Sequence, residues 1–145
     1  SKFLVRKEYL LAMEAFDVGY ETGSVIIGQP GIGKTYFLIY ALIERLLQGK
    51  PVAFQLDRHR YALFAEAEVT LHDAARSRTP LWRSDLWALS DSNEITILPA
   101  DAFQSTADIR IFQATSPAFK RWKGWSKQRN VGRFVMDVWS IEETA

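Results

Sequence analysis

The apolar positions of this chain fall into short blocks with two different spacings. Residues 24–27, 51–56, 86–91, 109–117 and 132–139 form compact runs rich in apolar side chains, the pattern of strands buried in a sheet. In residues 5–16, 36–48 and 117–128, apolar side chains recur every three or four positions, which is the spacing of a helix face. Strands that alternate with helices predict an α/β fold with a mainly parallel sheet.

Some segments carry weaker or mixed signals. Residues 36–48 are apolar on almost every side, which predicts a helix buried over most of its surface. Residues 61–71 contain the Tyr, Phe, Val and Thr that suit a pleated surface, so we predict a hairpin there, with a helix as the alternative. Residues 57–60 are predicted to form a polar turn, and residues 99–106 a loop or turn.

Segment 28–35 reads GQPGIGKT and fits the G-x-x-x-x-G-K-[ST] pattern of phosphate-binding loops. Its glycines permit backbone angles that a Cβ forbids, and they let amide N–H groups approach an anion. Lys34 can reach the outer phosphates of a nucleotide, and the Thr35 hydroxyl can hold Mg²⁺. The alternative is a glycine-rich turn that ends in Lys-Thr by chance. The predicted nucleotide contacts in this part of the chain are Gly28, Gln29, Pro30, Gly31, Ile32, Gly33, Lys34, Thr35 and Tyr36.

The strand predicted at residues 86–91 ends in Asp91, which matches the Walker B pattern of an apolar strand with a terminal acid. Asp91 would then share the Mg²⁺ site with Thr35. The alternative is an ordinary strand that ends in an aspartate turn. Gln113, Thr115 and Ser116, at the end of the fourth predicted strand, could contact a γ-phosphate or its attacking water. Ser116 could equally cap the helix that follows, and both roles are compatible.

Composition limits the remaining possibilities. The 145 residues suit one domain, predicted to span residues 1–145. A net charge of +1 points to no particular partner. The chain has no cysteine, which excludes disulfides and thiol chemistry and is neutral to mildly favourable for an intracellular setting. The compartment is open, and so is secretion of a parent protein. No apolar run approaches the ~20 residues of a membrane span, so we expect no membrane partner.

A basic run near the end of the chain carries a second possible function. Its residues are Lys120, Arg121, Lys123, Lys127, Arg129 and Arg133. They could bind nucleic acid, although a solvated helix face is the commoner meaning of such a run. The five tryptophans are predicted to lie in the core rather than to stack on bases. His59 and His72 lack metal-ligand spacing.

The order of these segments resembles the P-loop NTPases, and within them the AAA+ and STAND-like branch. That resemblance implies a three-layer α/β sandwich with a five-stranded sheet in the order 5-1-4-3-2. The fourth strand would be a sensor strand, and residues 3–5 would line the base pocket. The run of motifs GQPGIGKT, WALSDSN, QATSP, WKxWxK and VMDVWSIEE resembles, more closely, the NTPase module of crinkler/RHS-type proteins of fungi and oomycetes. In that family the module is joined to a separate effector domain, such as a nuclease-like one.

Departures from the pattern bear on catalysis. Ser92 stands where many hydrolysing relatives carry a glutamate, and Glu94 is displaced from that position. We also expect the domain at residues 1–145 to lack the C-terminal lid of AAA+ relatives. We therefore expect binding of ATP (or GTP) with Mg²⁺ and slow hydrolysis, with Lys34, Asp91 and Glu94 as catalytic candidates. The alternatives are a nucleotide-gated switch without turnover, the nucleic-acid module, and a small-molecule kinase that uses Asp57, Arg58 and Arg60.

Overall fold

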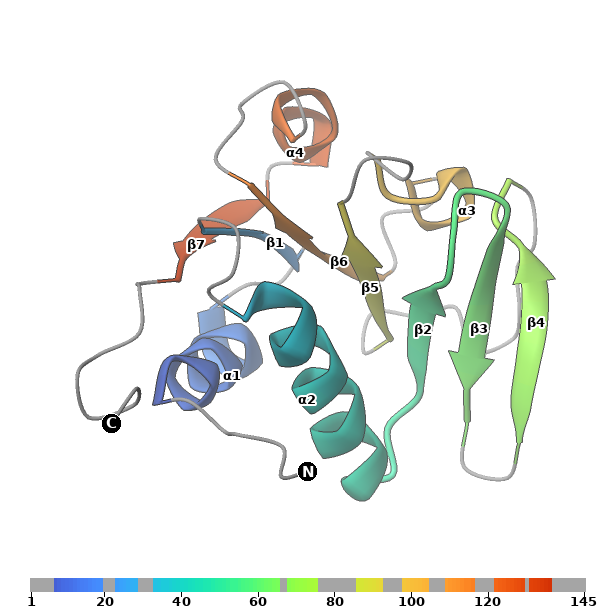
Figure 1. The fold of residues 1–145 in the computed structure, drawn as a ribbon, viewed down its shortest axis with the longest axis horizontal. Coiled ribbons are helices and arrows are strands. Elements are labelled where there is room, and N and C mark those ends of the chain that lie inside the picture. Colours follow the sequence, from blue (N-terminus) through green and yellow to red (C-terminus); the bar gives the residue numbers. More distant parts are fainter. Residues whose placement is uncertain are drawn as a thin grey trace.

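A mixed β-sheet forms the centre of the fold (Figure 1). The computed structural model describes residues 7–19, 23–28, 33–65, 68–75, 86–92, 98–104, 109–116, 122–129 and 131–136. In these residues the strands are β1 (Gly23–Ile27), β2 (Val52–Gln55), β3 (Arg60–Phe64), β4 (Val69–Asp73), β5 (Trp87–Asp91), β6 (Arg110–Thr115) and β7 (Gly132–Val135). The helices are α1 (Lys7–Gly19), α2 (Lys34–Leu47), α3 (Asp101–Gln104) and α4 (Lys123–Arg129).

The sheet differs from the prediction in strand count and order. Over the described ranges it has seven strands in the order β4-β3-β2-β5-β6-β1-β7. Strands β7, β1, β6, β5 and β2 are parallel neighbours, whereas β3 and β4 pair antiparallel. The five-stranded sheet 5-1-4-3-2 was wrong as the whole sheet because it left out the β3–β4 hairpin, which continues the sheet beyond β2; the five strands it did contain follow one another as β7-β1-β6-β5-β2. The α/β class and the mostly parallel sheet are confirmed.

The hairpin predicted at residues 61–71 is confirmed, and the helix alternative is wrong. β3 pairs with β2 on one side and with β4 on the other, so its apolar side chains gain a buried face that a lone hairpin would lack. Tyr61 and Leu63 are buried on one side of β3. By contrast Val69 and Leu71 of the edge strand β4 are 57% and 61% exposed.

Two apolar clusters lie on opposite faces of the sheet, as the alternation of strand side chains requires. On one face α1 and α2 pack through Phe16 and Phe37 against Trp87, Leu89 and other strand residues. On the other face Phe103 of α3 and Trp125 of α4 pack against strand residues such as Val25 and Ile111. Figure 1 shows the same separation, with α1 and α2 apart from α3 and α4. The chain is therefore a helix–sheet–helix sandwich.

Helix α2 is less buried than its sequence predicts. Phe37, Leu38 and Ala41 face the sheet, but Ile43 is 45% exposed and Leu47 is 77% exposed. The prediction of a mostly buried helix was wrong because α2 has the sheet on one side only. The helix ends as expected, at Gly49 with φ 73°, where the N–H groups of residues 49 and 50 bond back to the carbonyls of residues 46 and 45.

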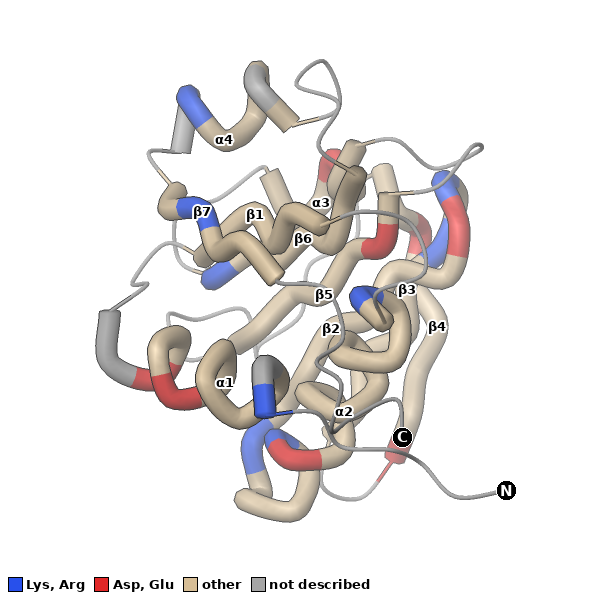
Figure 2. Tube along the Cα trace, turned by 60° about the vertical axis from the view of Figure 1, so that its left-hand side comes forward, with Lys and Arg blue, Asp and Glu red and all other residues tan. Residues whose placement is uncertain are grey.

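Charge and apolar length add two observations. Figure 2 shows few charged residues along the middle strands of the sheet, with charges concentrated in helices, turns and strand ends. Within the described residues, no helix is long and apolar enough to cross a membrane.

One further expectation needs correction. Residues 99–106 were predicted as a loop or turn, but residues 101–104 form α3, which begins at Asp101 and buries Ala102 and Phe103.

Candidate functional site

Segment 28–35 joins strand β1, which lies between β6 and β7 in the sheet, to α2. Gly28 is buried, and its N–H donates to the carbonyl of Thr115 at 3.3 Å. Gly33 has φ 91° and ψ 23°, a left-handed conformation that favours glycine, and it stands directly before α2. Its carbonyl accepts the N–H of Phe37 at 2.9 Å, which starts the helix. The last glycine of the segment is therefore required by its backbone angles.

The Lys34 side chain reaches from the start of α2 back to the end of β1. Its Nζ donates to the carbonyl of Gly28 at 2.6 Å. Burial lowers the pKa of Lys34, and the negative charge of Asp91 partly offsets that shift. The ammonium group is thus partly desolvated and lies near a carboxylate.

Thr35 and Asp91 meet although 56 residues separate them. The Thr35 hydroxyl donates to Oδ2 of Asp91 at 2.8 Å. Burial raises the pKa of Asp91, and this shift is opposed by the Thr35 hydrogen bond and by the charge of Lys34. The structure therefore brings together three of the residues singled out in the sequence, at the carboxyl ends of parallel strands.

The donor set at this point fits Mg²⁺. A hydroxyl and a carboxylate are the hard oxygen ligands that this ion prefers, and Mg²⁺ usually keeps several waters and takes further oxygens from phosphates. The described residues contain no group of three or more His, Asp or Glu side chains that could hold a metal alone. Two protein oxygens beside a lysine thus fit an ion that arrives with a phosphate ligand.

The other predicted site residues differ in burial, and several lie outside the described residues. Thr115 pairs with Ile27 of β1, but its side chain is fully buried, and its Oγ1 has no hydrogen-bond partner in the residues that the structure describes. Ser116 follows it and is half-buried, while Tyr36 is 61% exposed on the first turn of α2. Gln29, Pro30, Gly31, Ile32 and Glu94 lie outside the described residues, as do residues 3–5.

A buried polar row, which the sequence did not predict, runs beside the site on the opposite face of the sheet. Oε1 of Gln55 accepts the Ser90 hydroxyl at 3.0 Å and the N–H of Ala100 at 2.9 Å. Farther along the same face, Nε1 of Trp125 donates to Oε1 of Gln113 at 2.8 Å. Ser90 directly precedes Asp91, so the row supports the strand that carries the carboxylate. The sequence did offer one signal for this row, because Gln55, Ser90 and Gln113 are polar residues inside three otherwise apolar strands.

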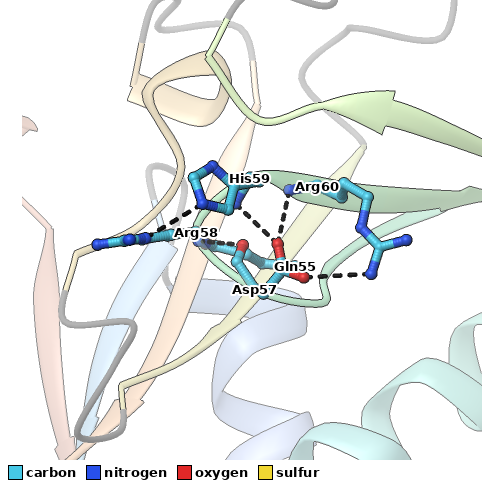
Figure 3. A network of polar contacts seen from close by, with 5 residues as sticks. All are labelled: Gln55, Asp57, Arg58, His59 and Arg60. Carbon is cyan, nitrogen blue, oxygen red and sulfur yellow. Dashed lines mark hydrogen bonds and ion pairs between the residues drawn. The ribbon is translucent and has the colours of Figure 1, made fainter.

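The turn between β2 and β3 is held by Asp57 (Figure 3). Its carboxylate accepts the N–H groups of His59 and Arg60 at 2.8 and 3.0 Å and pairs with the Arg60 guanidinium at 3.2 Å. These backbone hydrogen bonds chiefly lower the pKa of Asp57, although burial acts against them. Arg58 donates from Nε to the His59 ring. The predicted polar turn is thus confirmed, and Nε2 of Gln55 ties it to β2 by donating to the carbonyl of Asp57 at 3.1 Å.

The structure describes only part of the basic run. Figure 2 shows basic residues on α4 and on β7, and the side chains of Lys127 and Arg133 are exposed. Trp122 and Trp125 are 6% and 3% exposed, so they lie in the core, as predicted, and offer no stacking surface. Trp87 is likewise buried. Lys120 and Arg121 lie outside the described residues, and so do Trp82 and Trp139.

Comparison with known proteins gives a distant relationship. No protein-family model matches the chain. The chain is 28% identical over 151 aligned residues to crinkler effector protein 15 of Phytophthora infestans, and equally to crinkler effector protein 16 of the same organism. Each match covers 99% of this chain but 24% of the relative, so the chain spans about a quarter of the length of these proteins. The crinkler resemblance is confirmed as distant homology, and the P-loop assignment stays a prediction.

Proposed function

We propose that this distant relative of the crinkler effectors binds a nucleoside triphosphate, such as ATP or GTP, together with Mg²⁺. The contact between Thr35 and Asp91 at 2.8 Å, with Lys34 close to both, carries the proposal. A magnesium-bound triphosphate needs oxygen ligands for the metal and a cation for its outer phosphates. Residues from two distant parts of the chain supply both.

Each residue has a defined part in binding. The Lys34 ammonium would exchange its bond to the Gly28 carbonyl for one to a β- or γ-phosphate oxygen. The first-turn N–H groups of α2 would donate to the phosphates, where the positive end of the helix dipole favours an anion. Thr35 and Asp91 would hold Mg²⁺ directly or through water, and the ion would neutralise the charge of the phosphates.

Turnover is expected to be slow. Phosphoryl transfer depends mainly on positioning and charge neutralisation, which this site can supply. The residue after Asp91 is Ser92, whose N–H is bonded to the carbonyl of Ala114 at 2.8 Å, and it has no carboxylate to polarise water. Water would have to be oriented by Glu94 or Ser116, because the Thr115 side chain is fully buried. A nucleotide-gated switch without turnover is the alternative.

A binding titration tests the proposal. Fluorescent ATP and GTP analogues would be titrated into the chain with Mg²⁺ and with EDTA. We expect saturable binding that weakens when Mg²⁺ is removed and that is lost in Lys34→Ala. Lys50→Ala is the matched control, because it removes an exposed lysine just beyond the other end of α2. Equal binding by Lys34→Ala and the wild type would refute the proposed site.

A single-turnover assay separates slow hydrolysis from the switch. Excess protein would be mixed with radiolabelled ATP and Mg²⁺, and phosphate release would be followed against Lys34→Ala. Release above that variant establishes hydrolysis by this site. Binding without such release assigns the switch.

A further inference from the structure

Helix α1 contacts the candidate site through Tyr9, which lies in the helix predicted at residues 5–16 and was not among the predicted site residues. The Tyr9 hydroxyl donates to the carbonyl of Gly33 at 2.7 Å, across 24 residues of sequence. The Tyr9 ring is 1% exposed and packs against Phe37 and Tyr40 of α2, with centroids 5.5 and 5.8 Å away. Because this packing fixes the ring, the direction of the hydroxyl is fixed as well.

The acceptor is the peptide group that immediately precedes α2. The carbonyl of Gly33 also accepts the N–H of Phe37, so it receives one bond from α2 and one from α1. A trans peptide is planar, and its C=O and N–H point in opposite directions. Holding the Gly33 oxygen therefore fixes the direction of the Lys34 N–H, one of the first-turn donors that have no acceptor inside the helix.

We propose that Tyr9 is a positioning residue for phosphate binding, a role that rests on the proposed function. Its hydroxyl keeps the Gly33–Lys34 peptide oriented so that the Lys34 N–H points at the phosphates. Gly33 makes such a restraint necessary, since a glycine at φ 91° has more accessible conformations than any other residue. Without the hydroxyl, the peptide samples other orientations and binding must order it.

The test is Tyr9→Phe, which keeps the packed ring and removes the oxygen. Inorganic tripolyphosphate, ATP and adenosine would be titrated separately, with Mg²⁺ present. We expect affinity for tripolyphosphate and for ATP to fall by the same factor, about threefold to tenfold, the size of one hydrogen bond's net contribution. Adenosine binding should be unchanged, because the defect concerns the phosphate contacts alone.

Two controls make the outcome decisive. Tyr61→Phe removes a hydroxyl from another fully buried tyrosine, which packs in the cluster on the other face of the sheet, and it should leave tripolyphosphate affinity unchanged. Hydrogen exchange of the Lys34 amide in the unliganded protein should be faster in Tyr9→Phe than in the wild type.

The outcomes separate the two proposals. Wild-type affinity for tripolyphosphate in Tyr9→Phe, with or without a lower melting temperature, overturns the positioning role and leaves the proposed function standing. If the wild type binds neither ATP nor tripolyphosphate, the positioning role and the proposed function are both overturned.

Discussion

Three glycines in different surroundings give a graded test of the backbone geometry. A Cβ on Gly23 would lie 1.9 Å from the carbonyl oxygen of Ile111 and 2.5 Å from its nitrogen. These are backbone atoms of the neighbouring strand β6, and Gly23 also has φ 112°. A Cβ on Gly49 meets nothing within 4 Å but φ is 73°, while Gly124 has an open position and no positive φ.

The expected costs follow from those surroundings. Gly23→Ala combines about 1–3 kcal/mol of backbone strain with separation of β1 from β6, which weakens one or two ladder hydrogen bonds of about 1 kcal/mol each. We therefore expect a loss of about 2–5 kcal/mol, a large part of the ~5–15 kcal/mol that stabilises a domain. Gly49→Ala should cost only the strain, about 1–2 kcal/mol. Gly124→Ala, in α4, should be neutral or gain up to about 1 kcal/mol.

Urea denaturation followed by circular dichroism measures all three free energies of unfolding. The predicted order of stability is Gly124→Ala, then Gly49→Ala, then Gly23→Ala. A loss for Gly23→Ala no larger than that for Gly49→Ala would refute the close approach of β1 to β6. If Gly23→Ala is insoluble, the free energy of unfolding would be measured at lower temperature on Gly23→Ser, whose Cβ meets the same atoms.

The remaining predictions concern single buried polar groups. Burial raises the pKa of Asp91, so the folded protein binds that proton more tightly than the unfolded chain, and stability falls as pH rises between the two pKa values. Asp91→Asn should therefore stabilise the protein at pH 7 and lose that advantage at pH 3, in urea titrations at both values. Thr115→Val removes a buried hydroxyl without a partner in the described structure and should raise stability by about 1 kcal/mol, or the melting temperature by about 3 °C. Gln55→Leu leaves the Ser90 hydroxyl and the Ala100 N–H without their acceptor and should cost about 2–4 kcal/mol in the same denaturation assay.

Each of these three predictions has an outcome that would contradict it. A stability difference between Asp91→Asn and the wild type that is the same at pH 3 and pH 7 would mean that the carboxylate carries no burial penalty. A destabilised Thr115→Val would show that the hydroxyl has a partner. A loss below about 1 kcal/mol for Gln55→Leu would show that the polar row is replaceable by apolar packing.

Sequence patterns predicted the elements better than their surroundings. Residue type and spacing located the strands, the hairpin and the helix after segment 28–35, because these depend on local alternation and on glycine positions. Local patterns could not show that the hairpin joins the main sheet, since that depends on a pairing between β2 and β3. They also overestimated the burial of α2, because an apolar side chain such as Leu47 does not reveal that only one layer covers its helix.

The candidate site was predictable to the extent that it uses a short motif. The Lys34, Thr35 and Asp91 side chains were identified from a glycine-rich pattern and an acid at a strand end, and the structure brings them together. Tyr9 could not be identified in this way. An aromatic residue on a helix face is ordinary core material, and its hydrogen bond to Gly33 exists only once α1 packs on α2.

Strand β5 also limits how the chain can change length. Ser90 faces the layer of α3 and α4, where it bonds to Gln55, whereas Asp91 faces α2, where it meets Thr35. A residue inserted or deleted in β5 before Ser90 would turn both side chains to the opposite faces, moving the hydroxyl toward α2 and the carboxylate into an apolar cluster. Insertions and deletions in this region should therefore be confined to the connections on either side of the strand.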